Sequence, residues 1–369
     1  MQRGRGNVPP PIGIAFDSDF GNNLDSFLTL ALLRAISAKG ESRVISVSIT
    51  KANLKAAQAE EAITDFYAGG HPAGGTGFGG GADKVGLATD GKMAGDTAIL
   101  DAVVAKKTAD GKPAYPSTIS RILDTAESGV TTRNMLLAQE NQNAVVVVDG
   151  PLTNVQQLMD LYGAKPQITA KVRFLVIAAG AFPNGSADIN IKNDIAAAKK
   201  VFAEWPTPIV AVGLEVGEAL PYPGSSIEND FSWTKSHPIV DAYRAYKTMP
   251  YDAHVSGMAA ALYAVHPEEG YFKLSEPGTI TVLDDGRTKF TPVAGGKHRY
   301  LIADPAQKDK VVKTYTQLVS AKPVPRAPGG RGPGGRGASG FGARGASGAA
   351  IIIQAPADEP PANVPPPVE

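Results

Sequence analysis

Three carboxylates near the start of the chain, Asp17, Asp19 and Asp25, are spaced closely enough to act together. The apolar run 12–16 before them predicts a buried strand, and the run 28–36 after them predicts a helix. The acids would then lie at the carboxyl end of a strand, where open α/β sheets bind ligands. Crowded carboxylates repel one another, and a hard cation such as Ca²⁺ or Mg²⁺ would relieve that repulsion. These residues alone allow equally a helix N-cap in a solvated acidic turn.

A second polar stretch, 149–154, follows the apolar run 144–148, which is typical of a strand buried on both faces. Its residues are Asp-Gly-Pro-Leu-Thr-Asn, and a helix is expected over 155–161. Taken alone, Thr153 or Asn154 would be interpreted as the N-cap of that helix.

Two further polar stretches come later in the chain. Residues 184–190, after an expected strand at 174–179, alternate Asn and Asp on a loop. Such side chains suit the hydroxyls of a sugar, because they offer donors and acceptors, and they also suit ordinary turns. Tyr251 and Asp252 are expected to open a helix that ends at Val265, and taken alone Asp252 would be interpreted as its N-cap.

The expected elements alternate between strands and helices. This pattern predicts an α/β fold in a single domain, Rossmann-like, with a mostly parallel central sheet and helices on both faces. The four polar stretches each follow a strand or begin a helix, so a parallel sheet would bring them to one edge. The expected strands are 12–16, 44–49, 144–148, 174–179 and 209–212, and the expected helices are 28–36, 54–67, 155–161, 195–202 and 258–265.

Composition divides the chain into three parts. Residues 1–10 are rich in Gly, Arg and Pro and are expected to be disordered, as is the Gly/Arg/Pro-rich tail 321–369. The folded domain is expected at 11–320. The Gly-rich loop 68–82 lacks the Lys-Ser/Thr pair of a phosphate-binding loop, so we interpret it as a surface or lid loop.

Bulk composition argues against several function classes. The 369 residues include 36 basic and 36 acidic side chains, a balance that argues against dedicated nucleic-acid or membrane binding. The chain has no cysteine, and its five histidines are not paired at metal-ligand spacing, which argues against a zinc hydrolase. With no long apolar run and no apolar leader, the chain as written is expected in the cytoplasm, or in the periplasm or outside the cell if a leader has been removed.

The Arg-Gly repeats around Arg331, Arg336 and Arg344 offer a different hypothesis, an RNA-associated protein. Neutral overall charge and a single interleaved aromatic residue, Phe341, count against it. We therefore expect no nucleic-acid partner.

Taken together, the polar stretches resemble the signature blocks of the inosine-uridine-preferring nucleoside hydrolases in order and rough spacing. The resemblance covers about 12–320. The blocks that carry it are DSDFGNNLD (17–25), ITKAN (49–53), GPLTN (150–154), ADIN (187–190), NDIAAA (193–198), VGLEV (212–216), Tyr251-Asp252 and SEPG (275–278).

This resemblance implies hydrolysis of the N-glycosidic bond of a ribonucleoside by a Ca²⁺-bound water. Family members hold one Ca²⁺ and are commonly dimers or tetramers, so a small nucleoside or related N-riboside and a second copy of the chain are the implied partners. By matching position, Asp19 would be the general base and a metal ligand, and Tyr251 would lie at the leaving-group position. The other implied metal ligands are Asp25, Thr153 (through its carbonyl) and Asp252, and the implied ribose-binding residues are Asp25, Asn53, Asn184, Asp188 and Asn190.

Three positions depart from the family pattern. Ser26 lies where the family has the second aspartate of a pair, so Ca²⁺ is expected to bind more weakly. Asp188 replaces a usual Glu, and Tyr251 replaces a frequent His; with a reference pKa of about 10, tyrosine is the weaker acid. Ser26 therefore favours an alternative hypothesis, a protein that kept the fold and binds ribose or nucleosides without hydrolysing them.

Overall fold

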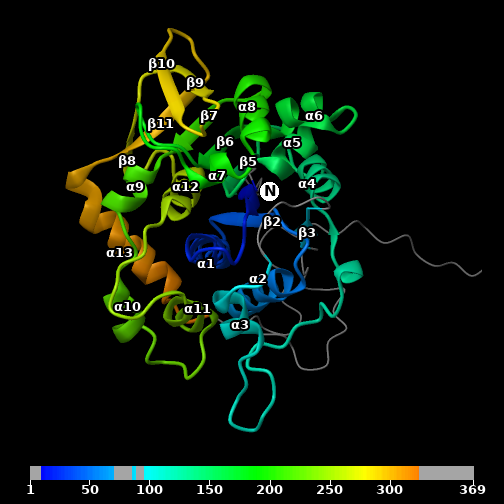
Figure 1. Ribbon diagram of the computed structural model, residues 1–369, viewed down its shortest axis with the longest axis vertical. Helices are drawn as coiled ribbons and strands as arrows, with labels where there is room; N and C mark the ends of the chain where they lie inside the picture. Colours follow the sequence, from blue (N-terminus) through cyan, green and yellow to red (C-terminus); the bar gives the residue numbers. More distant parts are fainter. Residues whose placement is uncertain (1–9, 70–84, 89–94, 324–369) are drawn as a thin grey trace, which may run out of the picture. The chain divides into compact units, whose positions relative to one another are not determined.

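The computed structural model describes residues 10–69, 85–88 and 95–323, and this part of the chain contains an 11-stranded sheet (Figure 1). The strand order is β10-β9-β11-β7-β6-β5-β1-β2-β3-β4, with β8 paired to β11. The strands are β1 (Ile12–Ser18), β2 (Ser42–Ile49), β3 (Gly86–Leu87), β4 (Ala126–Glu127), β5 (Ala144–Asp149), β6 (Val172–Ala178), β7 (Ile209–Val212), β8 (Phe272–Leu274), β9 (Gly278–Val282), β10 (Thr288–Pro292) and β11 (His298–Ala303).

The sheet is mostly parallel, as the sequence predicts. Neighbouring strands are parallel along the whole sheet order β4-β3-β2-β1-β5-β6-β7, and β11 is also parallel to β7. The antiparallel pairs are confined to the edge, where β8 and β9 pair with β11 and β9 pairs with β10. The central strands consist largely of Val, Ile and Ala because both of their faces are covered.

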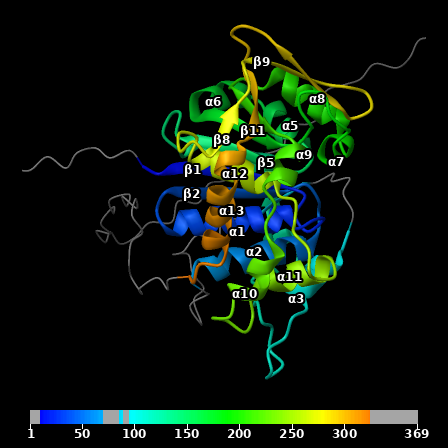
Figure 2. The ribbon, with the colours of Figure 1, turned by 90° about the vertical axis from the view of Figure 1, so that its left-hand side faces the viewer.

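Helices cover both faces of the sheet, and residues along each strand alternate between two apolar clusters. In β5, Val145 and Val147 pack in one cluster with α1 and α12, whereas Val146 and Val148 pack in the other with α5 and α8. Figure 2 shows α1, α2 and α13 on one side of β1 and β5, and α5, α6 and α8 on the other. The helices are α1 (Asp25–Ala38), α2 (Leu54–Tyr67), α3 (Ala98–Val104), α4 (Ser128–Leu137), α5 (Thr153–Asp160), α6 (Ala164–Lys171), α7 (Ile189–Lys192), α8 (Ile195–Glu204), α9 (Leu214–Ala219), α10 (Gly224–Asn229), α11 (Pro238–Tyr246), α12 (Ser256–Val265) and α13 (Lys308–Val319).

The order of the strands reverses between β1 and β5. The chain runs outward from β1 through β2, β3 and β4, then returns to place β5 on the other side of β1. Ser18, the last residue of β1, pairs with Asp149, the last residue of β5. The carboxyl ends of these two strands are the topological switch point, at which doubly wound folds bind ligands.

Several predicted boundaries match the structure, and α2 and β7 begin and end at the predicted residues. The helix predicted to open at Asp252 is an error, because α12 begins at Ser256. Asp252 caps no helix there: its Oδ1 accepts a hydrogen bond from the Gly224 amide, and Ala253 pairs with Tyr222 through the backbone. These contacts hold 252–253 extended.

The N-cap that Thr153 or Asn154 would suggest for α5, taken alone, is not formed. The residue at the cap position is Leu152, which makes no side-chain cap. Thr153 Oγ1 instead donates to Asp194 Oδ2 (2.8 Å), and Asn154 Nδ2 donates to Asp17 Oδ1 (2.7 Å). Both side chains therefore tie α5 to neighbouring elements.

Some predictions fall on residues outside the described part of the chain: the segment 1–9, most of the Gly-rich loop 68–82, and the tail from 324 onward. The domain limits 11–320 thus stay a prediction. Within the described ranges, we find no helix with the length and apolar composition needed to cross a membrane.

Candidate active site

Five buried or largely buried aspartates gather around the carboxyl ends of β1, β5 and β6: Asp17, Asp19, Asp25, Asp149 and Asp188. Asp17 and Asp149 belong to β1 and β5, Asp19 follows β1, Asp25 begins α1, and Asp188 precedes α7. The solvated acidic turn considered from the sequence is therefore excluded.

Burial raises the pKa of every carboxyl in this group. The pKa of Asp19 and of Asp188 rises to about 6, that of Asp25 to about 7, and that of Asp17 to about 8. For Asp149, burial comes first and the charges of Asp25, Asp19 and Asp188 add to it, so its pKa lies well above the ordinary value. The aspartates are thus close enough to oppose one another's ionisation.

Asp19 is held by a few contacts and keeps one oxygen open. Its Oδ2 accepts a hydrogen bond from Asn22 Nδ2 (3.2 Å), and its backbone N–H donates to the Asp149 carbonyl (3.3 Å). Its Oδ1 is buried and accepts no hydrogen bond from the described residues. Asp19 therefore has a buried acceptor with no donor in the part of the chain that the structure describes.

Lys51 is a buried cation beside Asp19, and sequence reasoning passed over it. Its Nζ donates to Asn22 Oδ1 (3.0 Å) and to the Gly95 carbonyl (3.4 Å). Burial lowers the pKa of Lys51, and the charge of Asp19 opposes that effect. Because Asn22 also contacts Asp19, the amide connects the lysine with the carboxylate.

Asp25 is fixed by two helices. Its Oδ1 accepts a hydrogen bond from Thr29 Oγ1 (3.2 Å), one turn further along α1, and its Oδ2 accepts one from the Gly257 amide (2.8 Å) in the first turn of α12. The amide at a helix N-terminus favours a negative charge on its partner.

Asp149 is a site residue that sequence reasoning missed. It is 2% exposed, and its Oδ2 accepts no hydrogen bond from the described residues. The available signal was a carboxylate at the end of an uninterrupted apolar run, immediately before Gly150-Pro151.

Asp17 lies on the opposite face of β1. Its Oδ1 accepts a hydrogen bond from Asn154, whose own Oδ1 accepts one from Ser128 Oγ (2.8 Å). A cavity of about 10 Å³, lined by Asp17, Ser48, Thr132 and Asn154 among others, adjoins this network. The space fits about one water molecule. This acid belongs to the contact between β1, α4 and α5.

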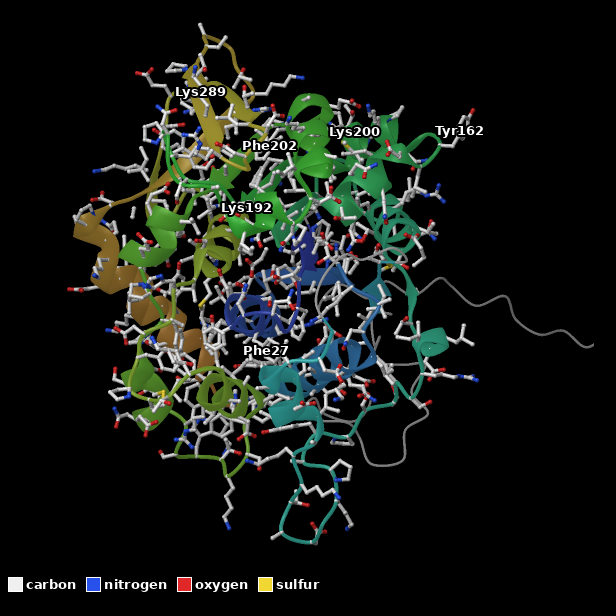
Figure 3. The ribbon with its side chains drawn as sticks, in the orientation of Figure 1. Phe27, Tyr162, Lys192, Lys200, Phe202 and Lys289 are labelled. Carbon is white, nitrogen blue, oxygen red and sulfur yellow. The ribbon has the colours of Figure 1, made fainter. Side chains whose placement is uncertain are left out.

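The loop after β6 brings Asp188 into the group. Asp188 accepts hydrogen bonds from the amides of Asn190 (2.8 Å) and Ile191 (3.3 Å), and so caps α7, whose last residue, Lys192, is labelled in Figure 3. Asn190 Nδ2 donates to the Ala178 carbonyl at the end of β6 (3.0 Å), while its Oδ1 is buried without a partner among the described residues.

Four predicted site residues have their contacts elsewhere. Asn184 is exposed and pairs through its backbone with Lys289 of β10. Asn53 caps α2 through the Ala56 amide and donates to Asp96 (2.8 Å). Asp252 is exposed, and its carboxylate accepts a hydrogen bond from the Gly224 amide.

The fourth of them, Tyr251, donates its hydroxyl to the Tyr243 carbonyl and stacks its ring on that of Tyr243, with centroids 4.5 Å apart. Burial raises the pKa of the Tyr251 phenol above its usual value. No hydrogen bond in the described structure links Tyr251 to the five aspartates.

The chemistry of the open oxygens fits a hard divalent cation. Among the described residues, no donor reaches the buried oxygens Asp19 Oδ1, Asp149 Oδ2 and Asn190 Oδ1. Carboxylate and amide oxygens are the ligands that Ca²⁺ takes in proteins. Within residues 10–69, 85–88 and 95–323, no three acidic or histidine side chains are arranged as a ligand set for a metal ion. The donors thus suit the cation, and a preformed cage is not seen among them.

Comparison with known proteins identifies relatives of this architecture. A family model described as inosine-uridine preferring nucleoside hydrolase matches residues 14–318. No curated protein sequence matches the chain. The family match confirms the resemblance noted from the signature blocks.

Solved structures share the fold at low sequence identity. The inosine-uridine preferring nucleoside hydrolase from Bacillus anthracis is 18% identical, with a TM-score of 0.58 over 84% of this chain and 99% of that one. A plant nucleoside hydrolase is 21% identical, with a TM-score of 0.60 over 85% and 100%. The type III effector protein XopQ, solved with adenosine diphosphate ribose, is 14% identical, with a TM-score of 0.57 over 85% and 94%. These structures confirm the predicted fold class.

Proposed function

Because the chain belongs to the inosine-uridine preferring nucleoside hydrolase family, we propose that it hydrolyses the N-glycosidic bond of a ribonucleoside to give free base and ribose. The observation that best supports this function is the group of buried aspartates at the switch point between β1 and β5. Glycosidic cleavage passes through an oxocarbenium-like state, and fixed carboxylates in a site of low dielectric stabilise its positive charge.

Asp19 is the general base of this proposal. With a pKa of about 6, it is mostly ionised at neutral pH yet basic enough to take a proton from the attacking water. Its open Oδ1 is the acceptor for that proton. The amide of Asn22 on Oδ2 keeps the carboxylate oriented.

Asp19 and Asp25 would hold the Ca²⁺, together with the carbonyl of Thr153 and with Asp252, which the family resemblance also implies. A bound Ca²⁺ would lower the pKa of the attacking water and supply positive charge. Asp252 would first have to leave the Gly224 amide.

Asp188 and Asn190 would bind the ribose hydroxyls from the loop after β6, with Asn53 and Asn184 from neighbouring loops. The open Asn190 Oδ1 is free to accept from a hydroxyl. Tyr251 would donate to the leaving base only after releasing the Tyr243 carbonyl. A nucleoside or a related N-riboside is the proposed ligand, and a homo-oligomer is the proposed assembly.

The second candidate function is nucleoside or ribose binding without turnover. The observation favouring it is Ser26, a buried hydroxyl with no hydrogen-bond partner in the described structure, at the place of an expected carboxylate.

A ribose-release assay separates the two functions. The full chain is incubated with a panel of purine and pyrimidine ribonucleosides at millimolar Ca²⁺, and binding of each nucleoside is measured by calorimetry. Release of ribose supports the hydrolase. Binding without release supports the binding protein, and the absence of both contradicts the two functions together.

A further inference from the structure

The site proposed above has one carboxylate on α1, that of Asp25, where the family resemblance implies a pair. Both carboxylate oxygens of Asp25 accept hydrogen bonds, one from Thr29 and one from Gly257, and the next residue is Ser26. The Ser26 hydroxyl is fully buried and makes no hydrogen bond with the described residues. The neutral hydroxyl of Ser26 provides no negative charge for a cation. The charge of the second carboxylate that the resemblance implies on α1 therefore has to come from another element.

Asp149 reaches the same region from β5. It is paired with Ser18 in the parallel register, so both side chains leave the sheet on the face that α1 and α12 cover. Its side chain is 2% exposed, and Oδ2 has no hydrogen-bond partner among the described residues. A buried carboxylate with an open oxygen is costly unless a cation or a proton compensates it.

Gly257 brings Asp149 and Asp25 together. Its amide donates to Asp25 Oδ2 at 2.8 Å. A Cβ atom at Gly257 would lie 2.5 Å from both Cγ and Oδ2 of Asp149, and 2.6 Å from Thr29 Oγ1. Two carboxyl groups from β5 and α1 therefore meet against one residue of α12, which has no room for a side chain.

Asp149 also adjoins Asp19 through the backbone. Its carbonyl accepts the Asp19 amide, and a Cβ at the next residue, Gly150, would lie 2.5 Å from that amide nitrogen. Asp149 is thus placed between the proposed base and Asp25.

We propose that Asp149 supplies from β5 the cation-binding carboxylate that Ser26 does not supply from α1. This inference rests on the proposed hydrolase site and names one of its ligands. The open Oδ2 of Asp149 is the ligand atom, and Gly257 keeps the space around it clear.

The test is calcium binding by the full chain, measured by titration calorimetry and by the shift of the thermal midpoint with added Ca²⁺. We expect Asp149→Asn to weaken Ca²⁺ binding at least about tenfold, since even residues that only support metal ligands cost 10–100-fold when changed. The matched control is Asp17→Asn, a buried aspartate of the opposite face, which should bind Ca²⁺ as the unaltered chain does.

A second variant tests whether the Asp149 carboxylate binds the cation itself or only maintains the structure of the site. Adding Ser26→Asp to Asp149→Asn returns a carboxylate to α1 and should recover part of the Ca²⁺ affinity. If Asp149→Asn fails to fold, Ser26→Asp alone is measured, and tighter Ca²⁺ binding than in the unaltered chain is expected. Unchanged affinity in either single variant would overturn the proposal, as would the absence of Ca²⁺ binding by the unaltered chain.

The outcome is distinguishable from failure of the proposed function. Calcium binding that depends on Asp149, without release of ribose, would keep this inference and contradict the hydrolase. Release of ribose by a chain whose Ca²⁺ affinity is unchanged in Asp149→Asn would support the hydrolase and contradict this inference.

Discussion

At the end of β1, the aspartates on the two faces of the sheet lie in different surroundings. On one face, Asp17 Oδ1 accepts a hydrogen bond from Asn154, which Ser128 contacts in turn, while Asp17 Oδ2 is buried without a partner among the described residues. On the other, which we call the open face, Asp19 and Asp149 each have a buried oxygen with no hydrogen-bond partner among the described residues, and Asp25 is anchored against α12. Burial is common to all of these acids, so burial does not distinguish them. An open oxygen does not distinguish them either, since Asp17 has one as well. The difference is crowding: the charges of Asp25 and Asp19 add to the raised pKa of Asp149, so several acids lie close together on the open face, where we propose binding and reaction.

The largest effect is expected from changing Asp19, the proposed base on the open face. Asp19→Asn keeps the shape of the side chain and removes its basicity, so the rate of ribose release should fall about 10²–10⁴-fold. The measurement is kcat with the best nucleoside of the panel. A variant that retains turnover would refute Asp19 as the base.

The second prediction is that the stability of the chain depends on pH. Burial holds the pKa of Asp25 near 7 and that of Asp17 near 8, against an ordinary 3.8. Above pH 4 the folded chain thus binds more protons than the unfolded chain, and its free energy of unfolding falls as pH rises. His237, whose pKa burial lowers to about 3, acts in the opposite direction up to its ordinary 6.5.

The informative window is therefore above about pH 6.5. Without added metal, the free energy of unfolding should fall by about 1–3 kcal/mol between pH 6.5 and roughly 8.5, measured by urea denaturation. Stability that rises across this window would show that the acids are not held protonated by burial.

The third prediction tests the crowding of the open face. In Gly257→Ala the added methyl group meets Asp149 and Thr29, so the chain should lose about 1–3 kcal/mol of stability, measured by urea denaturation. The control is Gly95→Ala, since a Cβ at Gly95 meets no atom within 4 Å. Equal stability of the two variants would mean that α12 can move away from Asp149.

The smallest effect is expected on the face of Asp17. With a pKa of about 8, Asp17 is mostly protonated at pH 7, so Asp17→Asn replaces it with a neutral group of the same size. We expect unchanged kcat and a change in stability within about 1 kcal/mol. A large loss of turnover would place Asp17 in the reaction and abolish the contrast between the faces.

The fold class could be predicted because the apolar runs of β1, β2, β5, β6 and β7 are unmistakable in sequence. The antiparallel strands after Val265 could not, because strands such as Gly278–Val282 alternate buried and exposed residues over only five positions. The start of α12 was placed too early because the partner of Asp252, the Gly224 amide, is 28 positions away and cannot be inferred from local sequence.

Part of the aspartate group could be predicted from the sequence. Asp19, Asp25 and Asp188 lie in recognisable blocks, and the structure brings them together. Asp149 was missed because its significance depends on the reversal of strand order that puts β5 beside β1. Which partner a polar side chain takes is likewise a property of the tertiary fold, as the exposed position of Asn184 shows.

The hydrogen bond from Gly257 to Asp25 joins residues 232 positions apart in the chain. Contacts of such sequence separation form late, because a long loop must close before they contribute. While the ribosome is still producing the chain, the first strand and helix can present their acids, but the segment that anchors Asp25 has yet to emerge. The site would therefore be assembled only after α12 has been synthesised, and a truncated chain that lacks α12 would carry the acidic cluster without its anchor.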